Sequence, residues 1–241
     1  MVIQKLEIYF LNYLYSIIFD ETNPDYLIYN VFSNEDQKSE YQNAIKIAIY
    51  TENIMPDINS ADYIIGHYHI NYLDRFFKYS IFLWNNFSNI DKNRELTLKN
   101  PIRNKFCAAL ISNYKSRFRM NFINILSKYK KVDMGGHCKN NINKIVKNKI
   151  DFLSEYKFSI AMENSNGDGY ISEKIVDSFL SGTIPIYYGD YIIDEYINPK
   201  AYILIKGEND IEKKVEYIKL IDKDDNLYKK KNFERKTNNR L

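Results

Sequence analysis

Charged and polar residues gather where a predicted strand is followed by a predicted helix, and they are the first candidates for chemistry in this sequence. Glu163 and Asn164 follow the apolar run 158–162, which is short enough for a buried strand. Lys174 then lies in the first turn of a helical pattern whose predicted N-cap is Ser172. The helix dipole disfavours a cation there, so a bound anion such as a phosphate would account for the lysine. A solvated lysine on an ordinary helix is the alternative.

Two arginines have a similar position after another predicted strand. The strand spans 106–112, a polar loop covers 113–116, and Arg117 and Arg119 lie in the opening turn of the helical pattern that follows. Arginine suits phosphate binding because its planar guanidinium can hold two oxygens at once. An arginine that is merely exposed at the surface is the alternative for each.

A carboxylate, Glu52, follows a third predicted strand at 44–50. Ligand-binding residues of open α/β sheets collect at the carboxyl ends of the strands, which makes Glu52 a candidate for acid–base chemistry. A loop carboxylate without a chemical role is the alternative.

Alternating strands and helices must position these residues. Apolar runs predict further strands at 25–29, 62–66, 131–134, 183–188 and 202–205, and helical spacing predicts helices at 6–19, 117–129, 147–156, 173–181 and 210–221. This alternation is typical of an α/β fold with parallel sheets. The polar stretch 85–104 predicts a linker. We therefore expect an amino-terminal domain at 1–104, a carboxy-terminal domain at 105–227 and a basic tail at 228–241.

Composition excludes several classes of function. The 241 residues are 45% hydrophobic, enough for a substantial core, and a net charge of +3 argues against nucleic-acid binding. The two cysteines, Cys107 and Cys138, lack metal-ligand spacing and favour a reducing compartment. The uncharged run 8–19 is too short to span a bilayer and lacks the features of a signal peptide, so we expect a cytoplasmic protein, with peripheral membrane contact as an option.

Three other patterns give weaker signals. His67 and His69 alternate as metal ligands on a strand can, but no carboxylate or cysteine cluster joins them. The run 222–224 is Asp-Lys-Asp, the form of a metal-binding motif, but its lysine-rich surroundings predict a solvated charge run. The aromatic stretch 76–84 suits contact with sugar rings or, equally, a place in the hydrophobic core.

The carboxy-terminal blocks together resemble the donor-site signature of the α-1,3-fucosyltransferases, glycosyltransferase family 10. That signature runs from Phe-Glu-Asn to Tyr-Val-Thr-Glu-Lys and then to Val-Pro-Val and Gly. Met162, Ile171 and Ser172 replace the family's phenylalanine, valine and threonine. The matching residues are Glu163-Asn164, Gly169-Tyr170-Ile171-Ser172-Glu173-Lys174, Gly182-Thr183-Ile184-Pro185-Ile186 and Gly189.

Other blocks extend the resemblance over about residues 25 to 205. Glu52-Asn53 and the segment 62–66 resemble the family's Thr-Gly-Glu-Asn and Asp-Tyr-Ala-Ile-Gly, with Thr51 where the family has glycine. Asn113, followed six residues later by Arg119, resembles the family's Ser-Asn loop and its phosphate-contacting arginine, with Arg117 as the runner-up.

The resemblance implies two Rossmann-like domains facing a cleft, the GT-B architecture, with a shortened amino-terminal domain. It implies a general base at Glu52. It also implies a set of donor-binding residues: Arg119, Glu163, Asn164, Tyr170, Glu173 and Lys174.

The implied reaction moves L-fucose with inversion from GDP-fucose to a hydroxyl, O3 of N-acetylglucosamine in an N-acetyllactosamine unit, with no cofactor and no required metal. Arg119 and Lys174 would stabilise the leaving diphosphate while Glu52 takes the acceptor's proton. A same-fold transferase of another nucleotide sugar and a non-catalytic nucleotide-sugar-binding relative are the alternatives. The basic tail, with Tyr228 and Phe233, suits docking on anionic lipid.

Overall fold

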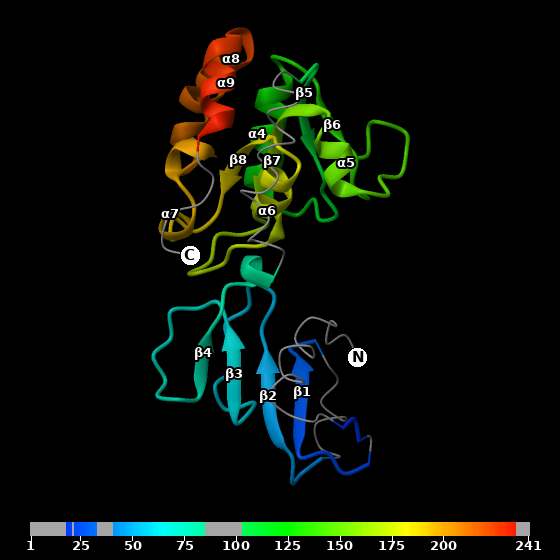
Figure 1. The fold of residues 1–241 in the computed structure, drawn as a ribbon, viewed down its shortest axis with the longest axis vertical. Coiled ribbons are helices and arrows are strands. Elements are labelled where there is room, and N and C mark those ends of the chain that lie inside the picture. The colour runs from blue at the N-terminus through cyan, green and yellow to red at the C-terminus, as the bar shows by residue number, and fades with distance from the viewer. Residues whose placement is uncertain (1–17, 21, 33–40, 85–102, 235–241) are drawn as a thin grey trace. The chain divides into compact units, whose positions relative to one another are not determined.

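The computed structural model describes residues 18–20, 22–32, 41–84 and 103–234 (Figure 1). Contacts divide the chain into two compact units, Met1–Tyr79 and Ser80–Leu241, which we call the amino-terminal and carboxy-terminal units. This division precedes the domain boundary at residue 104 that the sequence suggested. The predicted helix at 6–19 and the predicted linker at 85–104 lie almost wholly outside the described residues.

A four-stranded parallel sheet forms the framework of the amino-terminal unit. Its strands are β1 (Tyr26–Asn30), β2 (Ile45–Ile49), β3 (Tyr63–Gly66) and β4 (Phe76–Lys78), in the order β1-β2-β3-β4. Side chains alternate across the sheet, so one face brings Tyr29, Ala48, Ile64 and Phe76 together as a core. The first three strands were predicted from apolar runs. The fourth falls inside the aromatic stretch 76–84, where the core alternative holds for Phe76.

A five-stranded parallel sheet forms the centre of the carboxy-terminal unit. Its strands are β5 (Lys105–Ala109), β6 (Val132–Met134), β7 (Tyr156–Met162), β8 (Ile184–Tyr188) and β9 (Ile203–Leu204), in the order β6-β5-β7-β8-β9. The chain adds β6 on one side of β5 and then returns to add β7 on the other. The strand order therefore reverses between β5 and β7, and open α/β sheets bind ligands at the carboxyl ends of the strands beside such a point.

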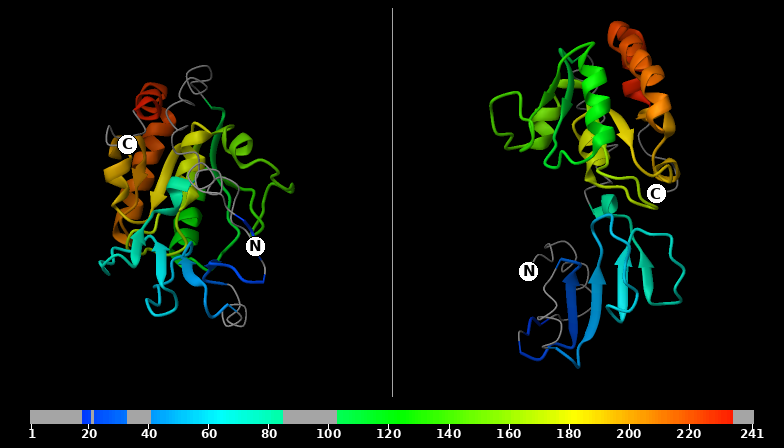
Figure 2. Two further views of the ribbon diagram at one scale, coloured as in Figure 1. Left: turned by 60° about the horizontal axis from the view of Figure 1, so that its bottom comes forward. Right: turned by 180° about the vertical axis from the view of Figure 1, so that it is seen from behind.

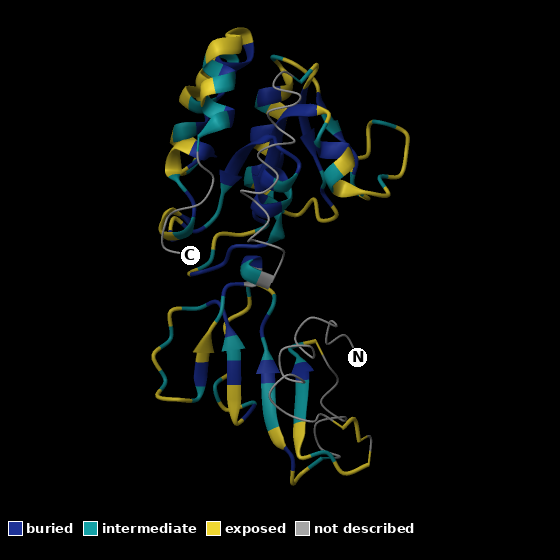
Figure 3. Cartoon of the chain, viewed as in Figure 1, coloured by how far each residue is buried: buried dark blue, intermediate teal, exposed yellow. Residues whose placement is uncertain are grey.

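Helices cover both faces of this sheet, as a parallel sheet requires. They are α4 (Arg117–Ser127), α5 (Lys149–Leu153), α6 (Glu173–Leu180), α7 (Ile193–Tyr196), α8 (Ile211–Lys223) and α9 (Asp225–Phe233), with 3-10 turns η1 (Ile81–Trp84), η3 (Pro199–Ala201) and η4 (Glu208–Asp210). Residues of α4 and α8 share a core with Phe158 and Ile160 of β7 on one face (Figure 2, right). Residues of α6 and α7 share a second core with Ala161 on the other. Every residue of β7 is consequently buried (Figure 3).

The basic tail predicted at 228–241 begins inside helix α9. The sequence did not predict this helix, because its lysine-rich composition is typical of an exposed tail. Tyr228 is completely buried, and its ring packs edge-on against Phe158 with centroids 6.3 Å apart. Because the ring belongs to the core, the predicted contact between Tyr228 and lipid is wrong. No helix within the described ranges has both the length and the apolar character needed to cross a bilayer.

The structure also corrects the prediction that the Asp-Lys-Asp run at 222–224 is a solvated charge run. The side chain of Asp222 is only 2% exposed and accepts hydrogen bonds from Tyr129 Oη (3.0 Å) and Lys130 Nζ (2.5 Å). Lys157 Nζ lies 3.2 Å from the other carboxylate oxygen and also donates to the backbone carbonyl of Asp222 (2.8 Å). The carboxylate therefore ties α8 to the start of β7 and is not a solvated charge. Asp224 is exposed and caps α9.

These contacts make Asp222 sensitive to acid. Burial by itself would raise the pKa of the carboxyl, but hydrogen bonds from Lys130, Tyr129 and Lys157 together bring the pKa below its ordinary 3.8. A group with a lowered folded-state pKa contributes stability above its unfolded pKa, and that contribution is lost as the pH falls through the folded value.

We expect Asp222→Asn to lower the free energy of unfolding by about 3 kcal/mol at pH 7, because the substitution removes the nearer and buried carboxylate partner of Lys157 and leaves only the exposed Asp225 at 3.7 Å. Urea unfolding followed by circular dichroism measures the change. The difference in unfolding free energy between the wild type and the variant should narrow as the pH falls from 3.8, the ordinary pKa of the carboxyl in the unfolded chain, through the lower pKa of the folded one.

Asp224→Asn is the matched control from the same charge run. Asp224 accepts the backbone N–H groups of Asn226 (2.9 Å) and Leu227 (3.1 Å), and asparagine caps a helix about as well as aspartate. We expect a change of at most about 0.5 kcal/mol. Equal losses in the two variants would contradict the buried role of Asp222.

Candidate functional site

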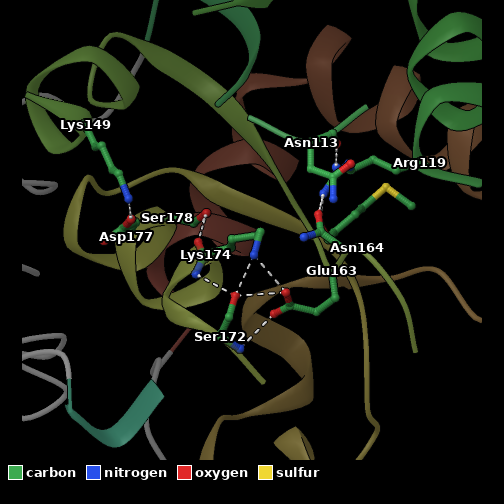
Figure 4. Close-up of polar contacts among 10 residues, drawn as sticks. Asn113, Arg119, Lys149, Glu163, Asn164, Ser172, Lys174, Asp177 and Ser178 are labelled. Atoms are coloured by element: carbon green, nitrogen blue, oxygen red, sulfur yellow. Dashed lines mark hydrogen bonds and ion pairs between the residues drawn. The ribbon is translucent and has the colours of Figure 1, made fainter. Parts of the chain in front are cut away.

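The carboxyl ends of β5 and β7 hold most of the residues that the sequence nominated. A loop after β5 leads into α4, and a loop after β7 leads into α6. Because the sheet is parallel, both loops leave the same edge, and they do so where the strand order reverses. Figure 4 shows the polar side chains that meet there.

Glu163 is completely buried directly after β7. Its Oε1 accepts a hydrogen bond from the backbone N–H of Ser172 (2.8 Å), and its Oε2 accepts from the Ser172 hydroxyl (2.8 Å) and from Lys174 Nζ (2.9 Å). Both carboxylate oxygens are engaged within the protein. Donor binding by Glu163, which the resemblance implied, stays a prediction.

Lys174 closes a triangle with the same two residues. Its Nζ donates to Ser172 Oγ (2.8 Å) as well as to Glu163, and its side chain is 21% exposed (Figure 4). An ammonium has three N–H donors, so after these two contacts the third has no acceptor among the described residues. The anion that a lysine at a helix start calls for is thus supplied by Glu163.

Helix α6 forms as the sequence predicted. Ser172 is the N-cap, and its hydroxyl accepts the backbone N–H of Lys174. Ile175, Val176 and Phe179 bury the inner face of the helix at helical spacing. Gly182 follows the helix with φ 75°, a left-handed conformation that glycine adopts without strain.

Arg119 extends from the first turn of α4 into the interior and is 2% exposed. Its Nη1 donates to the Met162 carbonyl (3.0 Å) and to Asn164 Oδ1 (2.7 Å), and its Nη2 donates to the Asn113 carbonyl. These bonds join the end of β7 to the loop after β5. The buried Nε–H has no acceptor among the described residues. Arg117, the runner-up, is exposed.

The surroundings of Arg119 affect its proton affinity. Burial lowers the pKa of the guanidinium, and the nearby Glu163 and Cys138 act in the opposite direction. Each hydrogen-bond acceptor found for Arg119 is a neutral oxygen.

The two cations therefore contact consecutive residues, Glu163 and Asn164, at the end of β7. Lys174 contacts Glu163, and Arg119 contacts Asn164. One cation comes from the helix after β5 and the other from the helix after β7, which explains why residues so distant in sequence share one site.

Sequence reasoning missed Asp190, which fixes the loop before α6. Its buried carboxylate accepts backbone N–H groups from Gly169 and from Ile192 (2.9 Å). Gly169 has φ 74°, so a residue with a side chain would be strained there. A carboxylate directly after a predicted strand was the available signal, the same one that singled out Glu52.

The remaining donor-site candidates differ in exposure. Tyr170 is 4% exposed and lies inside the fold just before α6, while Asn164 and Glu173 are half-buried. Glu173 occupies the first position of α6, where its charge suits the helix dipole. Donor binding by these three residues stays a prediction.

Glu52 belongs to the amino-terminal unit and is exposed in the loop after β2. Thr51, where the family has glycine, accepts a hydrogen bond on its hydroxyl from the Asn30 amide (3.0 Å), which links β1 to β2. Thr51 does not have a positive φ, so the loop needs no glycine there. The role of Glu52 as general base stays a prediction.

Comparison with protein families matches both halves of the chain. Residues 100–239 match the carboxy-terminal domain of glycosyltransferase family 10 (fucosyltransferase), and residues 3–85 match the α-(1,3)-fucosyltransferase FucT amino-terminal domain.

Two curated relatives agree with these matches. The chain is 28% identical over 221 residues to the α-(1,3)-fucosyltransferase FucT of Helicobacter pylori, which covers 78% of this chain and 46% of the relative. It is 30% identical over 134 residues to human 4-galactosyl-N-acetylglucosaminide 3-α-L-fucosyltransferase 9, which covers 53% of this chain and 36% of the relative. The chain thus spans less than half the length of either relative.

The fold agrees as well. A crystal structure of an α1,3-fucosyltransferase with GDP is 25% identical, with a TM-score of 0.79 over 94% of this chain and 75% of that one. The predicted fold class, two Rossmann-like units of the GT-B glycosyltransferase type, is confirmed. The family's carboxy-terminal domain matches more than half of this chain, and the chain therefore belongs to glycosyltransferase family 10, the fucosyltransferases.

Proposed function

We propose that this chain is an inverting fucosyltransferase that moves L-fucose from GDP-fucose to a hydroxyl of a glycan. The family and the names of its relatives support the transfer of fucose, and the GDP in a similar structure supports the nucleotide. The human relative's name supports O3 of N-acetylglucosamine in an N-acetyllactosamine unit as the acceptor.

One observation carries the proposal: Arg119 and Lys174 contact the consecutive residues Asn164 and Glu163 at the switch point of the sheet, and each cation has an N–H donor without an acceptor among the described residues. Breaking the bond between fucose and the diphosphate builds negative charge on the leaving phosphate. Cationic donors fixed in advance stabilise that charge without the cost of reorganising at the moment of reaction. The amino end of α6 adds its dipole to theirs.

The acceptor hydroxyl requires a base as its oxygen attacks the anomeric carbon. We assign this role to Glu52, an exposed carboxylate at the end of a strand of the other unit. In a single displacement the proton passes from the hydroxyl to the carboxylate, the new C–O bond forms, and the bond to the diphosphate breaks on the opposite face. One base suffices for this step.

Two alternatives make different forecasts. A same-fold transferase of another sugar would release free nucleotide from a different donor in a panel of GDP- and UDP-sugars. A non-catalytic relative would bind GDP without turnover, and substitution of Glu52 would change nothing.

We expect Lys174→Ala and Glu52→Ala each to lower kcat by about 100-fold or more, because one removes a donor to the leaving group and the other removes the base. GDP release from GDP-fucose in the presence of N-acetyllactosamine measures the effect. Asp57→Asn is the control for Glu52, since Asp57 is exposed in the same loop and the amide can still accept the Asn59 N–H (3.0 Å). Full activity in Glu52→Ala would refute the assigned base.

We also propose that the reaction needs no metal ion, because Arg119 supplies positive charge and Lys174 a directed N–H donor, the two roles that a divalent cation fills for the leaving group in metal-dependent transferases. Turnover should therefore be the same with and without EDTA. Loss of activity in EDTA that Mn²⁺ or Mg²⁺ restores would overturn this proposal.

A further inference from the structure

We propose that Glu163 is a positioning residue for the donor: it does not touch the nucleotide sugar but aims the Lys174 ammonium at the diphosphate. This inference rests on the proposed function, because it concerns how that function's site holds its leaving group. The residues of the donor signature do not by themselves distinguish this role of Glu163 from direct contact with the nucleotide sugar.

The geometry gives Glu163 no surface on which a ligand could lie. The residue has no exposed area, and its two carboxylate oxygens accept three hydrogen bonds of 2.8–2.9 Å. The backbone of Gly189 packs against the Glu163 side chain. A Cβ at Gly189 would lie 2.3 Å from Tyr187 Oη and 3.0 Å from Cγ of Glu163, so the backbone there approaches as closely as glycine allows.

The same contacts fix the direction of Lys174. Two of its three N–H donors are held, one by Glu163 Oε2 and one by Ser172 Oγ, so the third has a single remaining direction. The serine hydroxyl donates to Glu163 and accepts from Lys174, and it therefore couples the two charged groups. A flexible lysine becomes a donor that is oriented before the ligand arrives, which is the condition for electrostatic preorganisation.

The charge balance also requires Glu163. Lys174 occupies the second position of α6, next to backbone N–H groups whose dipoles repel a cation. Without the carboxylate, repulsion from the helix start would favour rotamers in which the ammonium turns away into solvent. Glu163 holds it against that repulsion.

Glu163→Gln tests the role, because the amide is uncharged and keeps only one of the two acceptor oxygens, so the Ser172 N–H and the Lys174 ammonium cannot both be bound as in the wild type. We expect this variant to weaken GDP binding about tenfold while leaving guanosine, which has no phosphate, bound as by the wild type. Calorimetric titration of both ligands measures the two affinities. In a Lys174→Met background the same substitution should cost nothing further, since the group on which Glu163 acts is gone.

Asp177→Asn provides the matched control. Asp177 lies on the same helix α6 and pairs with Lys149 (3.5 Å), away from Glu163 (Figure 4). We expect GDP affinity within about twofold of the wild type. Thermal unfolding by circular dichroism shows whether each variant folds. Should Glu163→Gln fail to fold, a comparison of Ser172→Ala with Ser172→Thr decides. Ser172→Ala should lower the affinity for GDP and leave that for guanosine unchanged. Ser172→Thr, which keeps the hydroxyl, should bind GDP as the wild type does.

The outcomes separate the two proposals. A loss of GDP affinity that is equally large in the Lys174→Met background, or that extends to guanosine, overturns the positioning role and leaves a general structural one. Unchanged GDP affinity in Glu163→Gln overturns it too. Wild-type protein that binds neither GDP nor guanosine would refute the proposed function itself.

Discussion

The buried contact between Glu163 and the start of α6 is the interaction on which the site at the carboxyl end of β7 depends. It joins the end of the central strand β7 to the N-cap Ser172 and to Lys174, so strand, helix and cation are held by one carboxylate. A buried charge is tolerated only when it is paired and hydrogen-bonded, and this one is both. The position of the helix and the direction of its lysine are therefore determined together.

Arg119 performs the corresponding task on the other side of the switch point. It bonds the Met162 carbonyl and the Asn113 carbonyl, which fixes the loop after β5 against the end of β7. The strand order makes this possible, because the reversal between β5 and β7 leaves the ends of two adjacent strands uncovered at one edge. Fold and site share the same bonds, so a variant of either residue affects both.

Local signals in the sequence predicted most of this arrangement. Alternating apolar runs gave the five strands of the carboxy-terminal sheet, and a capping serine followed by helical spacing placed α6 correctly. What could not be predicted were contacts between residues far apart in sequence. Asp222 lies in a run that is polar by composition, and only the fold brings Lys130 and Lys157 to it. The burial of Tyr228 could not be predicted either, because the neighbouring lysines indicate an exposed segment although the inner face of α9 is buried.

Lys174 and Arg119 differ in how their charges are compensated within the protein. Lys174 was singled out because a cation at a helix start needs an anion, but Glu163 already supplies that anion. The mismatch alone is thus no evidence for a phosphate. Arg119 differs, since its hydrogen-bond acceptors are neutral oxygens and its charge has no direct carboxylate partner among them. A diphosphate entering the site would therefore draw its net electrostatic attraction from Arg119, whereas Lys174 would contribute a directed hydrogen bond.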